Sequence, residues 1–235
     1  MQNDGSKEAK ESLSKLFQSP EHIIEKAKEY SEKSDFEESE KEIPYYYFMV
    51  KHFIAEHESR FGTIPVQVHN EHRMTLDHLV RARVNDYKGN TDKAIGHLCR
   101  ALLDIIKLNC AGLRKEIDKK HNAIPKKALG LISNGDYIKN FIEKQNEAED
   151  LLNEARCEDH KIGSDIDVNI GIVNLFIKAY IAHYEWHKFQ YKNMGNALVI
   201  KTRYYVITGY PLIISFIVGF AVNLIYDYLK QVLGN

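Results

Sequence analysis

The segment from Val206 to Tyr226, "VITGYPLIISFIVGFAVNLIY", contains no formal charge. As an α-helix it is about 30 Å long, which is the thickness of the hydrocarbon core of a bilayer. Tyrosines flank it on both sides, as in the aromatic belts of transmembrane helices: Tyr204, Tyr205 and Tyr210 at the start, Tyr226 and Tyr228 at the end. The alternative is a buried central helix of a soluble bundle. We expect a single C-terminal transmembrane helix, because core helices rarely run this long without a charge.

Charges beside this segment predict its orientation. Basic residues precede it, whereas Lys230 after it is offset by Asp227. Positive charges mark the cytoplasmic side of a membrane span. We therefore expect a single-pass protein of the inner (plasma) membrane, with the bulk of the chain cytoplasmic and membrane lipid as one partner.

The rest of the chain has helical periodicity, and no run alternates as strands do. Ser19 and Thr91 are predicted N-caps, and Gly62 and Gly89 are predicted helix stops. These signals divide the chain into predicted helices: Pro20 to about Lys33, Pro44 to Phe61, Asn70 to Lys88, Asp92 to Lys120, Pro125 to about Ile132, Tyr137 to about Cys157, and a long helix opened by a capping box at Ser164–Asp167. The predicted fold class is all-α, a helical bundle followed by a single C-terminal transmembrane helix.

Composition suggests how the chain is organised. The net charge is −1, so no global charge points to nucleic acid as a partner. Residues 1–43 form an acidic helical segment and linker, and residues 44–203 form the cytoplasmic bundle with a basic juxtamembrane helix. Residues 204–229 form the transmembrane helix, and residues 230–235 are a short tail.

Polar and small residues follow one face of the predicted transmembrane helix. At about 100° per residue, they fall within an arc of roughly 80°: Thr208, Ser215, Gly219 and Asn223. The Ser-xxx-Gly spacing allows close approach of two helices. This polar stripe is interpreted as the contact face of a homo-oligomer or the lining of a narrow pore; chance is the remaining alternative.

A short repeat supplies the candidate ligand-binding residues. "HLVRARVN" (residues 78–85) and "HLCRALLD" (residues 97–104) each place His, Arg and a polar residue on one helical face. In an antiparallel hairpin the two copies would bring imidazoles and guanidiniums together, a combination that binds phosphate or transfers protons. The candidates are Arg81, His97, Arg100 and Asp104. The structural alternative is an Arg100–Asp104 ion pair at i, i+4.

The stretch "RMTLDH" places Arg73 and His78 with four residues between them. It resembles the R-x4–6-H signature of HEPN domains, helical bundles that act as RNases in many prokaryotic defence systems. The resemblance covers residues 44–190 and implies that Arg73 and His78 are catalytic across a dimer interface. HEPN domains usually have a polar residue after the Arg; Met74 here favours a non-catalytic bundle.

Other enzyme classes lack their motifs. The sequence contains no Gly-rich phosphate loop, no G-x-S-x-G and no HExxH. His183 and His187 have zinc-chelating spacing, but two ligands do not make a site. We therefore expect no metal and no cofactor, and if the chain is an enzyme, a metal-independent RNase.

The layout resembles that of membrane-acting effectors of prokaryotic immunity. We therefore expect a membrane-anchored effector of an antiphage defence or toxin system that self-associates and permeabilises or depolarises the membrane. A protein, nucleotide or nucleic-acid regulator would act through the bundle. The alternatives are a membrane-tethered HEPN-type RNase and a non-enzymatic tail-anchored adaptor.

Overall fold

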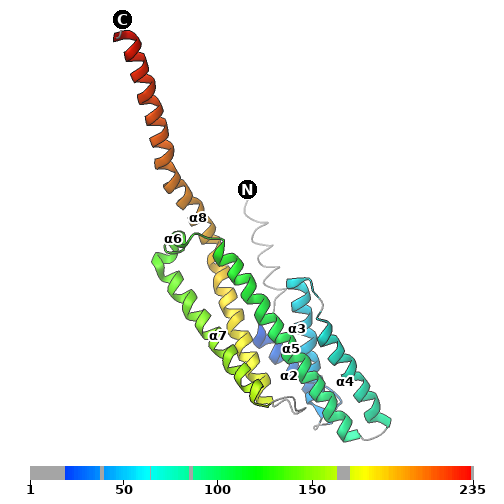
Figure 1. The fold of residues 1–235 in the computed structure, drawn as a ribbon. Coiled ribbons are helices and arrows are strands. Elements are labelled where there is room, and N and C mark those ends of the chain that lie inside the picture. The colour runs from blue at the N-terminus through cyan, green and yellow to red at the C-terminus, as the bar shows by residue number, and fades with distance from the viewer. Residues whose placement is uncertain (1–18, 38–39, 64, 85–86, 163–169, 234–235) are drawn as a thin grey trace, which may run out of the picture. The chain divides into compact units, whose positions relative to one another are not determined.

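The computed structural model describes residues 19–37, 40–63, 65–84, 87–162 and 170–233. Within these ranges every regular element is a helix and no strand occurs, which confirms the all-α fold class (Figure 1). The elements are α2 (Pro20–Glu32), α3 (Glu42–Phe61), α4 (Val66–Val84), α5 (Tyr87–Asn122), α6 (Lys126–Leu129), the 3₁₀ helix η2 (Ile132–Gly135), α7 (Asp136–Ile162) and α8 (Ile170–Leu233).

The chain divides into two compact units. The first contains the described residues up to Ile117 together with Glu143–Lys188. The second contains Asp118–Ile142 and the described residues from Phe189 onward. Helices α5, α7 and α8 each contribute residues to both units.

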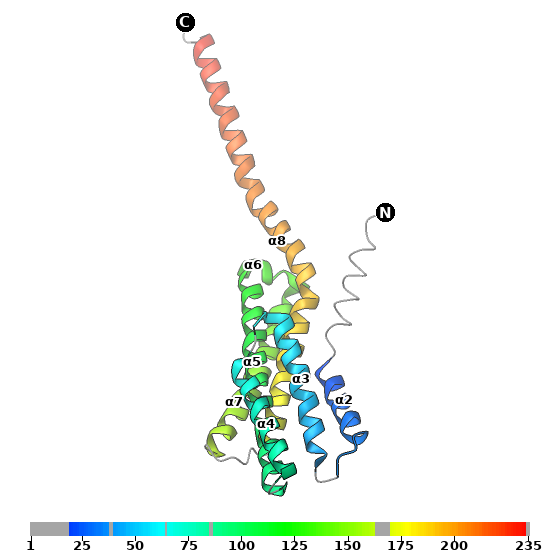
Figure 2. The same cartoon turned by 90° about the vertical axis from the view of Figure 1, so that its right-hand side faces the viewer.

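The first unit has a hydrophobic core to which α2, α3, α4, α5, α7 and α8 all contribute. Helices α3, α4 and α5 lie side by side in both views (Figures 1 and 2). Complete burial of one large apolar side chain stabilises a fold by roughly 1.5–3 kcal/mol. The core includes many such side chains, among them Phe53, Leu98, Leu102, Ile105, Ile106, Leu113 and Phe176.

Two predicted helix ends are confirmed. The Ser19 hydroxyl accepts a hydrogen bond from the His22 backbone N–H at 3.3 Å and caps α2. Gly62 adopts a left-handed conformation (φ 64°) and ends α3. Glycine is favoured there because a Cβ atom is strained at positive φ.

Three other boundaries were predicted wrongly. Helix α4 begins at Val66 rather than Asn70, because the Pro65 carbonyl accepts the backbone N–H of His69 and starts the helix earlier, and it ends at Val84 rather than Lys88. Helix α5 begins at Tyr87, so Gly89 does not end a helix and Thr91 does not cap one. The Thr91 hydroxyl instead donates to the Tyr87 carbonyl within the helix, at 2.8 Å. The predicted capping box at Ser164–Asp167 lies outside the described residues.

The second unit has a small core of its own. Tyr137 and Phe189 stack with their ring centroids 5.6 Å apart, and Lys201 Nζ donates to the Ala123 carbonyl at 2.8 Å. The helix predicted from Pro125 to Ile132 ends at Leu129, and the separate turn η2 follows. The buried apolar side chains of this core are Ile124, Ala128, Leu129, Ile132, Tyr137 and Phe141.

The end of α8 contains a helix, Val199–Tyr226, that is long and apolar enough to cross a membrane, and its most apolar window is not buried. Large apolar side chains from Tyr205 to Tyr226 are 45–77% exposed. The alternative of a buried central helix is therefore wrong. Pro211 lies inside this helix and lacks the N–H that would bond to the carbonyl of Ile207.

Candidate functional site

The hairpin of α4 and α5 brings His78 and His97 together. Their rings stack with centroids 5.2 Å apart and planes inclined by 16°. His78 is buried on α4, and His97 is partly buried on α5. The two copies of the sequence repeat thus meet at their histidines.

Both imidazoles use Nδ1 inside the protein. His78 Nδ1 lies 3.0 Å from Asn90 Oδ1, and His97 Nδ1 lies 2.6 Å from Glu71 Oε2. Both partner atoms are acceptors, so each Nδ1 carries the hydrogen and donates it. The two Nε2 atoms make no hydrogen bond with the described residues and are the ring atoms that an incoming ligand would meet.

The two histidines line a cavity of about 230 Å³ together with Lys93 and Arg100. Lys93, His97 and Arg100 occupy positions i, i+4 and i+7 of α5, so they share one helical face. Two permanent positive charges and two imidazoles therefore surround one small space. We refer to these four residues as the cationic cavity.

Arg100 makes no ion pair with any residue that the structure describes. The Arg100–Asp104 ion pair offered as the structural alternative is not formed, although the charge of Arg100 acts on the Asp104 carboxyl. Burial raises the pKa of Asp104, and Lys107 opposes that rise. Lys107 itself pairs with Asp159 at 2.7 Å.

The remaining candidates of this region lie outside the cationic cavity. Arg81 is exposed and pairs with Asp77 at 2.9 Å, so it does not join Arg100. Arg73 is exposed on α4, and at about 100° per residue it lies roughly 140° around the helix from His78. Within one chain, therefore, Arg73 and His78 do not share a helical face. The catalytic role of this pair remains a prediction.

Sequence reasoning missed Lys93 as a cavity residue. The repeat directed attention to the eighth position of each copy, whereas the second cation comes from four residues before His97. The helical i, i+4 spacing was the available signal.

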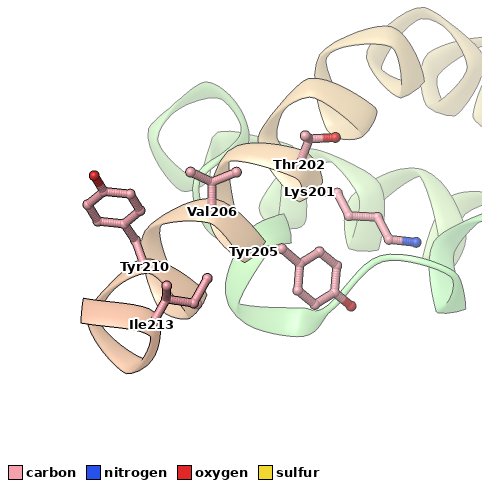
Figure 3. A pocket seen from close by; sticks show the side chains of 7 residues that line it. Lys201, Thr202, Tyr205, Val206, Tyr210 and Ile213 are labelled. Atoms are coloured by element: carbon pink, nitrogen blue, oxygen red, sulfur yellow. The ribbon is translucent and has the colours of Figure 1, made fainter. Parts of the chain in front are cut away.

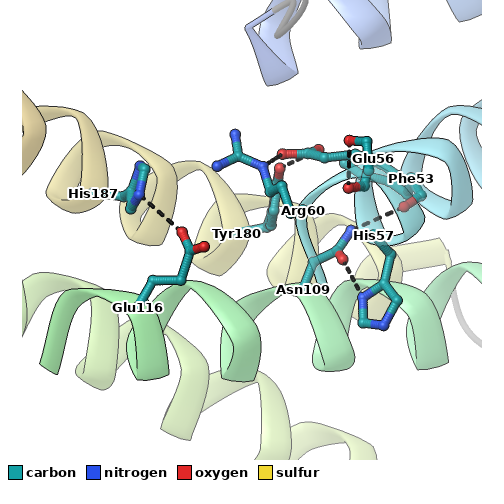
Figure 4. A network of polar contacts seen from close by, with 9 residues as sticks. Phe53, Glu56, His57, Arg60, Asn109, Glu116, Tyr180 and His187 are labelled. Atoms are coloured by element: carbon teal, nitrogen blue, oxygen red, sulfur yellow. Dashed lines mark hydrogen bonds and ion pairs between the residues drawn. The ribbon is translucent and has the colours of Figure 1, made fainter. Parts of the chain in front are cut away.

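A second polar cluster lies in the core of the first unit (Figure 4). Arg60 Nε pairs with Glu56 Oε1 at 2.8 Å, and the Tyr180 hydroxyl donates to Glu56 Oε2 at 2.5 Å. The Arg60 and Glu56 side chains are only 8% and 11% exposed. Burial raises the pKa of the Tyr180 hydroxyl well above its ordinary value, so it stays a donor.

The same cluster continues around Asn109. Its Nδ2 donates to the Phe53 carbonyl at 3.2 Å, and its Oδ1 lies 2.8 Å from His57 Nδ1. Since Oδ1 only accepts, His57 Nδ1 donates, and Nε2 accepts from the Thr63 hydroxyl at 3.0 Å. Sequence reasoning did not predict this cluster. We refer to it as the core polar network; its residues are Phe53, Glu56, His57, Arg60, Thr63, Asn109 and Tyr180.

The histidine pair considered for zinc is held by protein partners. His183 is fully buried, and its Nδ1 donates to the Ala179 carbonyl at 2.8 Å. His187 Nε2 lies 3.1 Å from Glu116 Oε2 (Figure 4). Across the described part of the chain, no group of three His, Cys, Asp or Glu side chains is placed to hold a metal.

Two cysteines are buried in the first unit. Burial raises the pKa of the Cys99 thiol to about 12 and that of Cys110 to about 12. A nucleophilic cysteine acts as the thiolate. These two side chains therefore do not supply a nucleophile at neutral pH.

The start of the candidate membrane helix, Val199–Tyr226, carries a shallow hollow of about 540 Å³ (Figure 3). It forms at Gly209, where a Cβ atom would meet nothing within 4 Å. By helical geometry its centre lies roughly 100° around α8 from the centre of the polar stripe. The lining residues are Lys201, Thr202, Tyr205, Val206, Gly209, Tyr210 and Ile213.

The polar stripe of α8 is open along its length. The Thr208 hydroxyl donates to the Tyr204 carbonyl at 2.7 Å and is thereby satisfied within the helix. A Cβ atom at Gly219 would meet nothing within 4 Å. Asn223 is exposed and its carboxamide has no hydrogen-bond partner among the residues described.

Comparison with protein-family models, with curated protein sequences and with solved structures gave no match to this chain.

Proposed function

We propose that this chain is a membrane-anchored effector that self-associates through the polar stripe of its C-terminal span and permeabilises the membrane. A defence or toxin system is the setting that this layout favours. The bundle would be cytoplasmic, because basic residues precede the span. The bundle would control the span.

The observation that carries the proposal is the unpartnered carboxamide of Asn223. Within hydrocarbon, a polar group without a hydrogen bond costs on the order of several kcal/mol. The chain supplies no partner for this amide among its described residues, so the nearest remedies are water or the same residue of another copy. A second copy of the span can supply either remedy, as a facing amide or as one wall of a water-filled lumen.

The space around Gly219 supports the same contact. Nothing within the described chain approaches the position of a Cβ atom there, so a second helix can pack against the bare backbone. Ser215, one turn earlier, gives a second small residue on that face. Large apolar residues cover the rest of the helix surface and suit lipid.

The test is membrane potential, followed with a voltage-sensitive dye in bacteria that express the full chain. We expect depolarisation by the wild-type chain, and its loss in Gly219→Leu and Asn223→Leu. Ala221→Leu is the matched control, since it also replaces a small residue by leucine but lies roughly 200° around the helix from Gly219. A chain that stops after Arg203 should leave the potential unchanged.

Three results would contradict the proposal. The first is a wild-type chain that is inserted but leaves the membrane potential unchanged. The second is that all the span variants depolarise the membrane as the wild-type chain does. Growth arrest without depolarisation, abolished by His78→Ala, would indicate the tethered RNase instead. Self-association is read separately by cross-linking in membranes, where Asn223→Leu should reduce the oligomer and Ala221→Leu should not.

A further inference from the structure

We propose that the cationic cavity of α4 and α5 binds a phosphoryl group. The ligand would be a phosphomonoester or a pyrophosphate, held by Arg100 and Lys93 and approached by the imidazoles of His78 and His97. This site goes beyond the proposed function of the span, because it would give the bundle a ligand of its own.

Arg100 is a half-buried arginine without an ion pair. Among the described arginines only Arg60 and Arg100 are not exposed; the Arg60 guanidinium is paired with Glu56, whereas Arg100 has no ion pair with the described residues. A guanidinium that is partly removed from water gains most from a planar oxyanion that accepts two of its N–H groups. The Arg100 side chain lines a cavity in which such an anion has room.

Two cations line the cavity. Lys93, like Arg100, makes no ion pair with any described residue. Two carboxyl groups lie nearby: Glu71, which is engaged with His97 Nδ1, and Asp104, whose carboxyl is acted on by the charges of Arg100 and Glu71. A phosphomonoester carries about −1.5 to −2 charges at pH 7, which matches two cations better than a carboxylate does.

Both imidazoles line the cavity, and they offer Nε2 to a ligand. Their Nδ1 atoms are taken by Asn90 and Glu71, which fixes the tautomer and leaves each Nε2 without a partner among the described residues. In this tautomer Nε2 accepts a hydrogen bond, which the P–OH of a phosphoryl group can donate. The two rings therefore add hydrogen-bonding positions to a site whose charge comes from Lys93 and Arg100.

The size of the cavity limits the ligand. Its volume of about 230 Å³ is below the roughly 300–1,000 Å³ of pockets that enclose drug-sized ligands. The cavity therefore holds a phosphoryl group, and the rest of the ligand stays in solvent. That group can belong to a soluble molecule or to a lipid headgroup.

The test is isothermal titration calorimetry of the full chain in detergent micelles, with sodium pyrophosphate as the probe and chloride held constant. We expect saturable binding by the wild-type chain. Arg100→Gln should weaken it about ten-fold or more, the equivalent of losing a bidentate charged contact. Lys93→Gln, at an exposed position, should weaken it by roughly three- to ten-fold.

Arg81→Gln is the matched control, because it removes the arginine of the other repeat copy, outside the cavity. It should leave the affinity within about two-fold of wild type. Trp186, the one tryptophan of the chain, is buried in the first unit. Its fluorescence reports whether each variant is folded.

Absence of saturable binding by the folded wild-type chain would overturn the proposal. So would an unchanged affinity in both Arg100→Gln and Lys93→Gln, or an equal loss in Arg81→Gln. A parallel titration with dihexanoyl phosphatidic acid separates the sources: tighter binding than pyrophosphate assigns the site to a lipid headgroup, and weaker binding assigns it to a soluble ligand. The depolarisation assay reads the span alone, so the two proposals fail independently.

Discussion

The first unit contains two polar clusters that differ in how well their charges are matched. In the core polar network, Arg60 has Glu56, Glu56 also accepts from Tyr180, and Asn109 bonds on both sides of its amide. In the cationic cavity, Arg100 and Lys93 have no ion pair with described residues, and a carboxylate at the edge is engaged with His97.

The difference separates structure from binding. A buried polar group that finds its partners within the chain fixes how helices pack, and losing one partner leaves the other uncompensated. Cations that line a cavity without ion-pair partners do not fix how the helices pack. Removing a residue from the first cluster should therefore destabilise the unit, and removing one from the second should affect only binding.

The largest effect is expected for Glu56→Leu. This change leaves the Arg60 guanidinium and the Tyr180 hydroxyl without their shared acceptor, and breaking a buried ion pair costs about 3–5 kcal/mol. The free energy of unfolding is measured by urea titration of the full chain in detergent, followed by the fluorescence of Trp186. The exposed pair is the control: Asp77→Leu should cost less than about 1 kcal/mol. Equal losses would remove the distinction between buried and exposed charge.

A smaller loss is expected for Asn109→Leu. The substitution leaves the Phe53 carbonyl and His57 Nδ1 without partners in a buried site, at a cost of about 1–3 kcal/mol for each unsatisfied group. The same urea titration measures it. Asn174→Leu, at an exposed position of α8, is the control and should change the unfolding free energy by less than about 0.5 kcal/mol.

The third prediction is that His183 makes the chain less stable at acid pH. Burial lowers the pKa of His183 from its ordinary 6.5, so the folded chain resists protonation while the unfolded chain accepts it. Stability is complete above pH 6.5 and falls as the pH drops toward the folded pKa, by at most about 1.4 kcal/mol per pH unit for one histidine. His183→Gln should reduce the slope of unfolding free energy between pH 7 and roughly 5.5, whereas His160→Gln, at an exposed site, should not. An unchanged slope in His183→Gln would show that this histidine is protonated equally in both states.

The smallest effect is expected for Arg100→Met, in buffer without phosphate. Because Arg100 has no ion pair to lose, the unfolding free energy should stay within about 0.5 kcal/mol of wild type. Arg60→Met, the same change in the core polar network, should cost about 3–5 kcal/mol, since it leaves Glu56 buried and uncompensated. Similar losses in both variants would show that Arg100 is structural and would end the comparison.

Several features were predictable from local sequence. The period of apolar residues, the cap at Ser19, the stop at Gly62 and the uncharged segment each act over one or two helical turns. They predict the all-α fold class and a helix able to span a membrane. The meeting of His78 and His97 also followed from the repeat, because two adjacent antiparallel helices with equivalent residues place them on facing sides.

Helix α5 does not begin where its local sequence predicts. Gly89 and Thr91 favour a boundary locally, but the helix runs through both. Glycine inside a helix costs about 1 kcal/mol, and the packing of a buried helix face exceeds that cost. Propensity alone therefore misplaced the start of this helix.

The sequence by itself determined which segments are helical and which one is apolar enough for a membrane, because both depend on near neighbours in the chain. Only the tertiary structure decided which charges are matched. Glu56 and Tyr180 are far apart in sequence, as are Phe53 and Asn109, and nothing local shows that they meet. Spacing alone places Lys93 on the helical face of His97 and Arg100, but it does not show that Arg81 stays outside the cavity, because that depends on how α4 and α5 are rotated about their axes as their apolar faces pack.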